Sequence, residues 1–330
     1  DTVFIGGGTP SVPECDVMEK LLQGLRDYFL FSADTEVTIE ANPGTLTPEK
    51  LSIYRKYGIN RISIGLQSPN NKELAMLGRI HNYAQFLESF QMAREAGFSN
   101  INVDLMFAIP GQCYEGWIEN LRMVAALGPE HISAYSLIIE EGTPFSRKKL
   151  DLPDEDTEYR MYEDVAVVLK EYGYHQYEIS NYAKAGCECR HNEGYWQRKD
   201  YLGLGLGAAS LLGKERFSNT SDMQEYLKNS SAPEKIRKNR GLLTREDEMA
   251  EFMFLGLRMT QGVSKKEFQE YFGTAIENIY GEVLKKLLNG FFLFTVKEII
   301  VIHQVFQILQ ITEKFVCIHH VFVYIVKVAD

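Results

Sequence analysis

Polar side chains follow several apolar, strand-like segments of this chain, each at the point where the segment ends. The first segment runs into the glycine turn Gly6–Thr9, three later ones end near Glu40, Gln67 and Asp104, and a fifth carries Tyr135. Carboxylate and amide groups hydrogen-bond hydroxyl and ammonium groups, and glycine lets backbone N–H groups approach a ligand closely. A buried carboxylate without a partner is strongly unfavourable, so this succession indicates one polar ligand rather than several separate defects.

Each of these features also has a structural interpretation. The glycine run could be a tight turn, Glu40 could cap a neighbouring helix, and Asp104 could be a hydrogen-bonded core carboxylate. Arg79 could be a surface cation, although its planar guanidinium also suits bidentate binding of an α-carboxylate. Taken together, the set favours a site for a nucleoside that carries an amino acid.

A second group of candidate residues lies in the segment Cys187–Trp196, which reads CECRHNEGYW. His191 could ligate iron axially, while Tyr195 and Trp196 could stack on a macrocycle. The alternative is a structural loop whose aromatic side chains plug the mouth of a barrel. Cys187 and Cys189 could ligate a metal beside His191, but a Cys-x-Cys pair alone is weak evidence, and we interpret them as incidental thiols.

Short apolar strands alternate with amphipathic helices through the first 180 residues. The expected strands are Thr2–Ile5, Glu36–Glu40, Arg61–Ile64, Asn100–Phe107, His131–Leu137 and Gln176–Ser180. Strands connected by helices need crossover connections, so we expect a parallel α/β sheet, either in a barrel or doubly wound. Both arrangements bind ligands at the carboxyl ends of the strands, where the polar side chains would meet.

The chain length predicts roughly two domains. From Arg245 onward the sequence is helical, and three short helices there could form a small winged-helix-like domain. We expect a barrel domain over residues 1–220 and a helical C-terminal domain over 221–290. Residues 291–330 contain six Phe, eight Val and seven Ile but no Gly, Pro, Arg or Asn, so we interpret them as a non-native or frame-shifted tail. The longest uncharged stretch of this tail, Ile299–Thr312, is too short and too polar for a bilayer span.

Charge and cysteine content exclude several classes of protein. The 45 acidic and 35 basic residues give a net charge of −10, which argues against a general nucleic-acid binder. Five scattered cysteines do not indicate a disulfide framework. With no signal peptide before the first strand, we expect a cytoplasmic protein without a membrane segment of its own.

Seven motifs occur in order between about Asp1 and Asn289: FIGGGTPS, EANPGTLTPEKL, GINRISIGLQS, LGRIH, NINVDLMFAIPGQ, HISAYSLIIEEGTPF and YEISNYAKAGCECRHNEGYW. Together they resemble the radical S-adenosylmethionine (radical SAM) proteins of the coproporphyrinogen oxidase group, and are most similar to the haem chaperones of that group. The resemblance implies a partial (β/α)6 barrel of the TIM type with a C-terminal helical domain.

The same resemblance implies roles for individual residues. It assigns the methionyl amino group of S-adenosylmethionine to Gly7, Gly8 and Thr9, the methionyl and ribose parts to Glu40 and Gln67, the carboxylate to Arg79 and the ribose to Asp104. The HNxxYW part of the last motif implies haem binding by His191, Tyr195 and Trp196.

One feature of the family is missing from this sequence. The family binds a [4Fe–4S] cluster through CxxxCxxC, and clusters of this kind need thiolate ligands. The spacing is not found among Cys15, Cys113, Cys187, Cys189 and Cys317. We therefore expect that the chain begins after the cluster motif and does not assemble the cluster.

The resemblance favours a protein that binds haem and delivers it to apo-haemoproteins, whose clients could include membrane-associated ones. The alternative is an oxygen-independent coproporphyrinogen III oxidase, in which a 5′-deoxyadenosyl radical abstracts hydrogen from propionate side chains before decarboxylation. A truncated, inactive product is the third interpretation.

Overall fold

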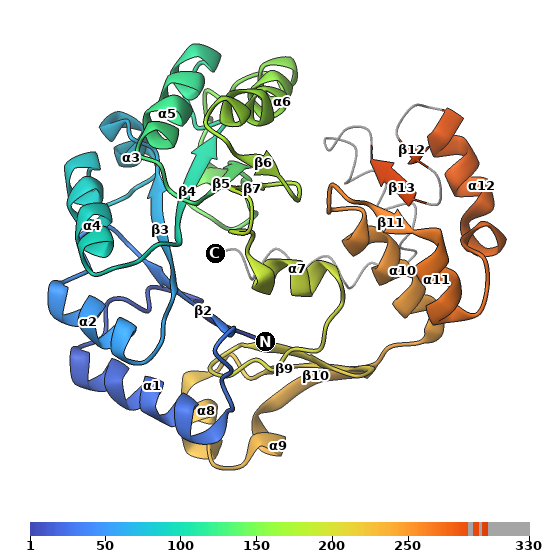
Figure 1. Ribbon diagram of the computed structural model, residues 1–330, viewed down its shortest axis with the longest axis horizontal. Coiled ribbons are helices and arrows are strands. Elements are labelled where there is room, and N and C mark those ends of the chain that lie inside the picture. Colours follow the sequence, from blue (N-terminus) through green and yellow to red (C-terminus); the bar gives the residue numbers. More distant parts are fainter. Residues whose placement is uncertain (290–292, 297–298, 303–330) are drawn as a thin grey trace. The chain divides into compact units, whose positions relative to one another are not determined.

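The chain forms two compact units in this computed structural model, which describes residues 1–289, 293–296 and 299–302 (Figure 1). The first unit contains Asp1–His191, and the second begins at Asn192. Of the predicted tail over 291–330, only 293–296 and 299–302 are within the described residues.

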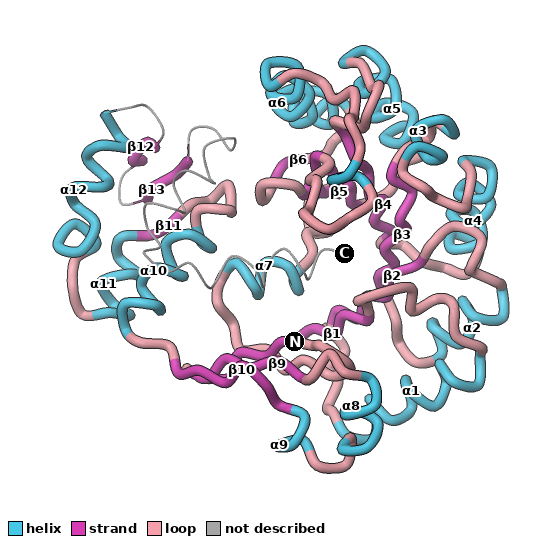
Figure 2. The backbone as a smooth tube through the Cα atoms, turned by 180° about the vertical axis from the view of Figure 1, so that it is seen from behind, coloured by secondary structure: helices cyan, strands magenta, loops and turns pink. Residues whose placement is uncertain are grey.

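The first unit alternates strands with helices. Its parallel strands are β1 (Thr2–Ile5), β2 (Glu36–Ala41), β3 (Arg61–Gln67), β4 (Ile101–Phe107) and β5 (His131–Ser136). Its helices are α1 (Cys15–Tyr28), α2 (Pro48–Lys56), α3 (Asn71–Met76), α4 (Tyr83–Glu95), α5 (Tyr114–Ala126) and α6 (Glu155–Glu171), with a 3₁₀ turn at Phe145–Arg147. Consecutive strands are neighbours, so the sheet lacks the switch point of a doubly wound fold and forms part of a barrel (Figures 1 and 2). The predicted β/α barrel is confirmed.

Local sequence signals set the ends of these helices. The Thr47 side chain accepts a hydrogen bond from the Lys50 N–H at the start of α2, and Pro48 occupies the first helical position. Asn82 and Gln85 form a capping box at the start of α4. Gly97, at a φ of +85°, follows that helix in the left-handed conformation typical of helix ends.

The predicted sixth parallel strand, Gln176–Ser180, is wrong. In its place β6 (His175–Gln176) and β7 (Asn181–Ala183) form a short hairpin, with β7 antiparallel to both β5 and β6. The turn between them is closed by Glu178, whose Oε1 accepts from the backbone N–H of Ser180 and from Asn181 Nδ2. These local hydrogen bonds reverse the chain within a segment that the apolar pattern predicts as one strand.

The two faces of the sheet differ in polarity. On one face the side chains are apolar and buried, among them Val37, Ile39, Ala41, Ile62, Ile64, Ile101, Val103, Leu105 and Ile132. The helices α1 to α6 lie along the outside of this sheet (Figure 2). The apolar face packs against them, for example where the Phe107 and Trp117 rings have centroids 5.3 Å apart. The alternate residues form the polar face: Thr2, Phe4, Glu36, Thr38, Glu40, Arg61, Ser63, Asn102, Asp104, His131, Ser133 and Tyr135. Parallel strands are usually apolar on both faces, so the polar face marks the functional side of the sheet.

The second unit contains two small sheets and a helical subdomain. Helix α7 (Arg190–Trp196) includes the residue at which the second unit begins, Asn192. The first of the two sheets contains β8 (Ala209–Leu212), β9 (Glu215–Asn219) and β10 (Arg237–Leu242). Helices α8 (Met223–Asn229) and α9 (Pro233–Ile236) lie between β9 and β10 in the sequence. The predicted C-terminal helices are α10 (Arg245–Gly256), α11 (Lys265–Phe272) and α12 (Ile276–Asn289). With β11 (Val263–Ser264), β12 (Leu293–Val296) and β13 (Ile299–Ile302) they give a winged-helix-like order of elements.

An apolar cluster holds the C-terminal helices together. Met253, Leu257 and Phe268 are buried at its centre, and the Phe252 and Phe272 rings lie 5.6 Å apart. No helix in the described part of the chain is both long and apolar enough to cross a membrane.

Candidate functional site

The glycine turn after β1 lies directly beside the carboxylate of Glu40. A Cβ atom at Gly6 would lie 2.7 Å from Glu40 Oε2, so a larger residue there would displace the carboxylate. Gly7 (φ +81°) and Gly8 (φ +144°) adopt backbone conformations that other residues rarely take. The Gly7 N–H donates to Glu40 Oε2 over 3.2 Å. The predicted tight turn therefore also supplies one backbone donor, the Gly7 N–H, to the Glu40 carboxylate.

Glu40 and Asp104 form a pair of carboxyl groups on the polar face. Burial, together with the nearby Asp104, raises the pKa of Glu40 to about 7, against the opposing effect of the Gly7 N–H. Burial also raises the pKa of Asp104, although hydrogen bonds from Asn102 Nδ2 (2.8 Å) and Ser63 Oγ (3.2 Å) act in the other direction. Asp104 is thus hydrogen-bonded within the sheet, as the structural interpretation requires, and is also close enough to Glu40 to interact with it. The pair offers acceptors to hydroxyl or ammonium groups.

The end of β3 turns Gln67 toward the polar face. The register between β3 and β4 shifts between Ile64 and Gln67, and Gln67 has a φ of +72°. Irregularities of this kind occur often beside active sites. The Gln67 side chain lies over Gly65, two residues earlier, and its Oε1 accepts a hydrogen bond of 2.8 Å from the Tyr135 hydroxyl on β5.

Tyr135 connects the predicted residues to one another. Burial raises the pKa of its hydroxyl well above the usual range; the charges of Asp104 and Glu40 act in the same direction, and that of Arg79 opposes them. These side chains therefore lie within interaction range, and we call Glu40, Gln67, Arg79, Asp104 and Tyr135 the strand-end cluster.

Two further predicted residues, Thr9 and Arg79, differ in the contacts that their side chains make. Thr9 Oγ1 accepts a hydrogen bond from Asn42 Nδ2 over 3.0 Å, which fixes the end of the glycine turn. The half-buried Arg79 guanidinium makes no ion pair or hydrogen bond with any residue that the structure describes. A cation in that situation can bind a carboxylate of a ligand.

His191 is built into the first unit rather than into a loop. It lies in α7, where the Glu36 carboxylate accepts the backbone N–H groups of Arg190 and His191, each over 3.0 Å. Its ring stacks on Phe4 with centroids 5.1 Å apart, and its Nδ1 hydrogen-bonds the Thr2 hydroxyl over 2.9 Å. Burial and the Arg61 charge lower the pKa of His191 to about 4, against the opposing effect of Glu36. The imidazole is therefore neutral at pH 7, which is the form that ligates metals.

Tyr195 and Trp196 follow on the same helix and pack within the second unit. The Tyr195 ring meets the Tyr201 ring edge-on at 4.7 Å, and the Arg258 guanidinium lies 4.1 Å from the centre of the Trp196 ring. Trp196 Nε1 is buried and has no hydrogen-bond partner among the described residues. His191 and Tyr195 are four residues apart and so lie on the same side of α7.

The described cysteines are not gathered into a metal site. Cys189 is buried beside Tyr177 and Ala183, with its Sγ 3.7 Å from Glu36 Oε1, and Cys187 packs against the same cluster. Within the residues that the structure describes, no group of three Cys, His, Asp or Glu side chains could hold a metal ion. Cys317 lies outside the described residues. The described residues therefore do not fit a [4Fe–4S] cluster.

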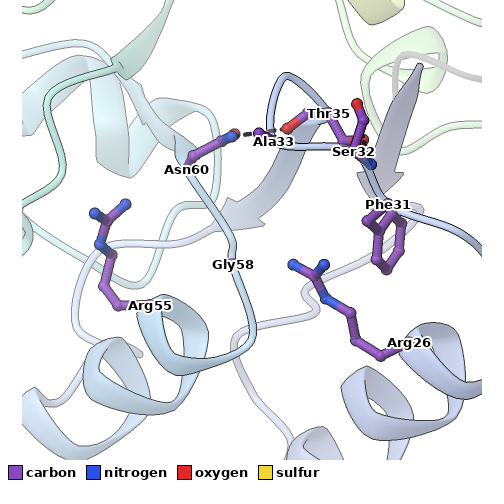
Figure 3. A pocket seen from close by; sticks show the side chains of 8 residues that line it. All are labelled: Arg26, Phe31, Ser32, Ala33, Thr35, Arg55, Gly58 and Asn60. Carbon is purple, nitrogen blue, oxygen red and sulfur yellow. Dashed lines mark hydrogen bonds between the residues drawn. The ribbon is translucent and has the colours of Figure 1, made fainter.

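A cavity of about 420 Å³ lies at the opposite end of the strands, before β2 and β3 (Figure 3). Its lining contains none of the predicted site residues. Arg26, which lines it, donates through Nε and Nη2 to the Tyr57 carbonyl oxygen and lies 4.2 Å from the Phe31 ring centre. The Arg26 guanidinium is therefore engaged in structural contacts with neighbouring residues.

Sequence reasoning missed Glu36, the residue that holds the start of α7. The signal available was the alternation Glu36, Thr38, Glu40 along β2, which puts three polar side chains on one face. This alternation could not show that the Glu36 carboxylate accepts hydrogen bonds from the start of α7, which lies more than 150 residues later in the sequence.

Comparison with known proteins agrees with the fold and with the sequence motifs. The sequence model of the Radical SAM superfamily matches residues 1–124, and that of the HemN C-terminal domain matches residues 243–293. A solved structure of the coproporphyrinogen III oxidase HemN from Escherichia coli, a radical SAM enzyme, superposes with a TM-score of 0.83 at 22% identity. It covers 95% of this chain and 77% of that chain, which shows a shared fold.

Sequence similarity to curated proteins is higher. The haem chaperone HemW of Bacillus subtilis (strain 168) is 40% identical over 291 residues, which is 87% of this chain and 77% of the relative. HemW of Escherichia coli (strain K12) is 36% identical over 295 residues, covering 88% and 77% of the two chains. At this identity and coverage, the chain belongs to the HemW family of haem chaperones within the radical SAM superfamily.

Proposed function

We propose that this chain binds S-adenosylmethionine at the strand-end cluster and haem through α7, and passes haem to apo-haemoproteins. The observation that carries the haem part is His191, a neutral, largely buried imidazole held by Phe4, Thr2 and the Glu36-capped helix start. The names of the HemW relatives support the same function.

The strand-end cluster supplies complementary groups for S-adenosylmethionine. The backbone of Gly7 and Gly8, with Thr9, would bind the methionyl amino group, beside the Glu40 carboxylate. Arg79 would pair with the methionyl carboxylate, since the structure gives its guanidinium no other described partner. Glu40 and Gln67 would contact the methionyl and ribose parts, and Asp104 the ribose.

The haem-binding residues would come from one helix. His191 would bind iron through its imidazole ring, and Tyr195 and Trp196 would contact the macrocycle. Haem would supply the iron to which the imidazole binds. The polar environment of His191 fixes the ring orientation before haem arrives, which reduces the ordering needed on binding.

No step of this proposal uses a [4Fe–4S] cluster, because the described residues do not fit one. Haem capture and transfer need a binding site and a partner surface. We place the protein in the cytoplasm, where cysteines stay reduced, and propose apo-haemoproteins, membrane-associated ones among them, as its clients.

Absorbance titration with haem tests the proposal. We expect the parental chain to give a Soret shift that saturates near one haem per chain, and His191→Ala to weaken haem binding by at least about tenfold. His175→Ala is the matched control, because His175 is half exposed and pairs with Glu188.

Equal haem affinity of His191→Ala and the parental chain would contradict the role of His191. A competition with iron-free coproporphyrin III addresses the oxidase alternative, because that enzyme would prefer the porphyrin with four propionates. Tighter binding of coproporphyrin III than of haem would favour the oxidase.

A further inference from the structure

Gln67 is held in one orientation by a residue to which no role is yet assigned. Its side chain is buried at the end of β3, and its Oε1 accepts the hydroxyl of Tyr135 over 2.8 Å. Tyr135 lies two strands away, near the end of β5. An amide can present either an acceptor or a donor to a ligand, and this hydrogen bond uses the acceptor.

The amide nitrogen of Gln67 is then the group left for a ligand. Nε2 makes no hydrogen bond with any residue in the described part of the chain, although Gln67 as a residue is only 4% exposed. It lies over Gly65, where a Cβ atom would approach it to 3.1 Å. Gly65 therefore leaves the space that the amide nitrogen uses.

The Tyr135 hydroxyl keeps its proton near neutral pH. Burial and the nearby Asp104 raise its pKa well above the usual range. A protonated phenol can donate, and in this geometry it donates to Gln67 Oε1, which holds the amide oxygen toward β5.

We infer that Tyr135 is a positioning residue that orients the Gln67 amide so that Nε2 donates to an acceptor atom of bound S-adenosylmethionine. This inference rests on the proposed function. It adds a specificity element from β5 to a site otherwise built from the ends of β1 to β4, and assigns Gln67 the role of donor.

A double-mutant cycle measured by calorimetric titration with S-adenosylmethionine tests this. Tyr135→Phe should weaken binding about 3- to 10-fold, as expected for one net hydrogen bond. In a Gln67→Ala background the same change should have an effect of less than about twofold, because its target is gone. General destabilisation would give equal losses in both backgrounds, so additive effects would overturn the inference.

Gln67→Glu provides a second measurement. A carboxylate still accepts the Tyr135 hydroxyl but replaces the donor with a negative acceptor, so we expect it to bind no better than Gln67→Ala. Affinity close to the parental value would show that Gln67 presents oxygen to the ligand, which contradicts the inference.

Tyr114→Phe is the matched control, because it removes a hydroxyl bonded to Asp164 between α5 and α6 and should leave affinity unchanged. Failure of the parental chain to bind S-adenosylmethionine would contradict that part of the proposed function, and the inference with it. Binding with additive losses would contradict the inference alone.

Discussion

Ile39, Ile64 and Val103 lie on the apolar face of the sheet of the first unit. Their neighbours along the same strands, Glu40, Ser63 and Asp104, lie on the polar face. The backbone is shared, so the difference comes from side chains alone. The apolar face stabilises the fold through burial against helices, whereas the polar face retains carboxyl groups whose burial raises their pKa values. Buried carboxyl groups are retained where they bind a ligand. We therefore expect mutations on the apolar face to lower stability and mutations on the polar face to weaken ligand binding.

The largest effect on stability is expected on the apolar face. Ile64→Ala removes a fully buried side chain and leaves a cavity, so the free energy of unfolding should fall by about 2–5 kcal/mol. Ser63→Ala, one residue earlier on the polar face, should lower it by about 1 kcal/mol. Urea unfolding followed by circular dichroism measures both, and equal losses would contradict the division of roles.

Asp104→Asn should change binding without loss of stability. The amide keeps the shape of the side chain but removes a buried acid, so the free energy of unfolding at pH 8 should not fall. S-adenosylmethionine affinity should fall by about tenfold, because hydrogen bonds to a charged acceptor are strong. Asp164→Asn, on α6, is the control; an unchanged affinity in Asp104→Asn would remove Asp104 from the site.

Binding of S-adenosylmethionine should strengthen with pH. The pKa of Glu40 is about 7, so the carboxylate that attracts the cationic ligand forms as pH rises from 6 to 8. We expect up to about a tenfold gain in affinity over that range, and a flat profile in Glu40→Gln. A parental profile as flat as that of the variant would show that Glu40 does not meet the cationic part of the ligand.

The same titration should act on stability in the opposite direction. Because the pKa of Glu40 is raised from 4.5 to about 7 on folding, its contribution to stability is complete below about pH 4.5 and is lost as pH rises through 7. The unfolding midpoint of Glu40→Gln relative to the parental chain should therefore rise between pH 4.5 and 8. A constant difference would contradict this.

The smallest effect that we expect is the change of haem affinity between pH 6 and pH 8. Burial lowers the pKa of His191 to about 4, so its imidazole stays neutral throughout that range and haem affinity should vary by less than about twofold. Absorbance titrations at several pH values measure this. A loss of affinity centred near pH 6.5 would indicate an ordinary exposed histidine.

The polar face was largely predictable from sequence, because a strand has a period of two. Glu40, Gln67 and Asp104 follow apolar runs, and parallel strands bring such ends together, which the structure shows. The role of Tyr135 was not predictable, because a hydrogen bond to a residue 68 positions away leaves no local pattern.

Two parts of the fold had no sequence signal strong enough to predict them. The hairpin of β6 and β7 depends on side-chain contacts of Glu178, which an apolar pattern does not encode. The sheet of β8, β9 and β10 contains the strand Arg237–Leu242, whose mostly exposed, polar residues lack the alternation typical of a half-buried strand.

The three glycines after β1 are constrained for different reasons. Gly7 and Gly8 are required by backbone angle, so a replacement at either would strain the turn whatever surrounds it. Gly6 is required by space, because a Cβ atom there would lie 2.7 Å from Glu40 Oε2 on β2 and 2.9 Å from Phe4 Cε1 on β1. Glu40→Asp should therefore relieve only the contact with the carboxylate, and Gly6→Ala would still have to displace the Phe4 ring.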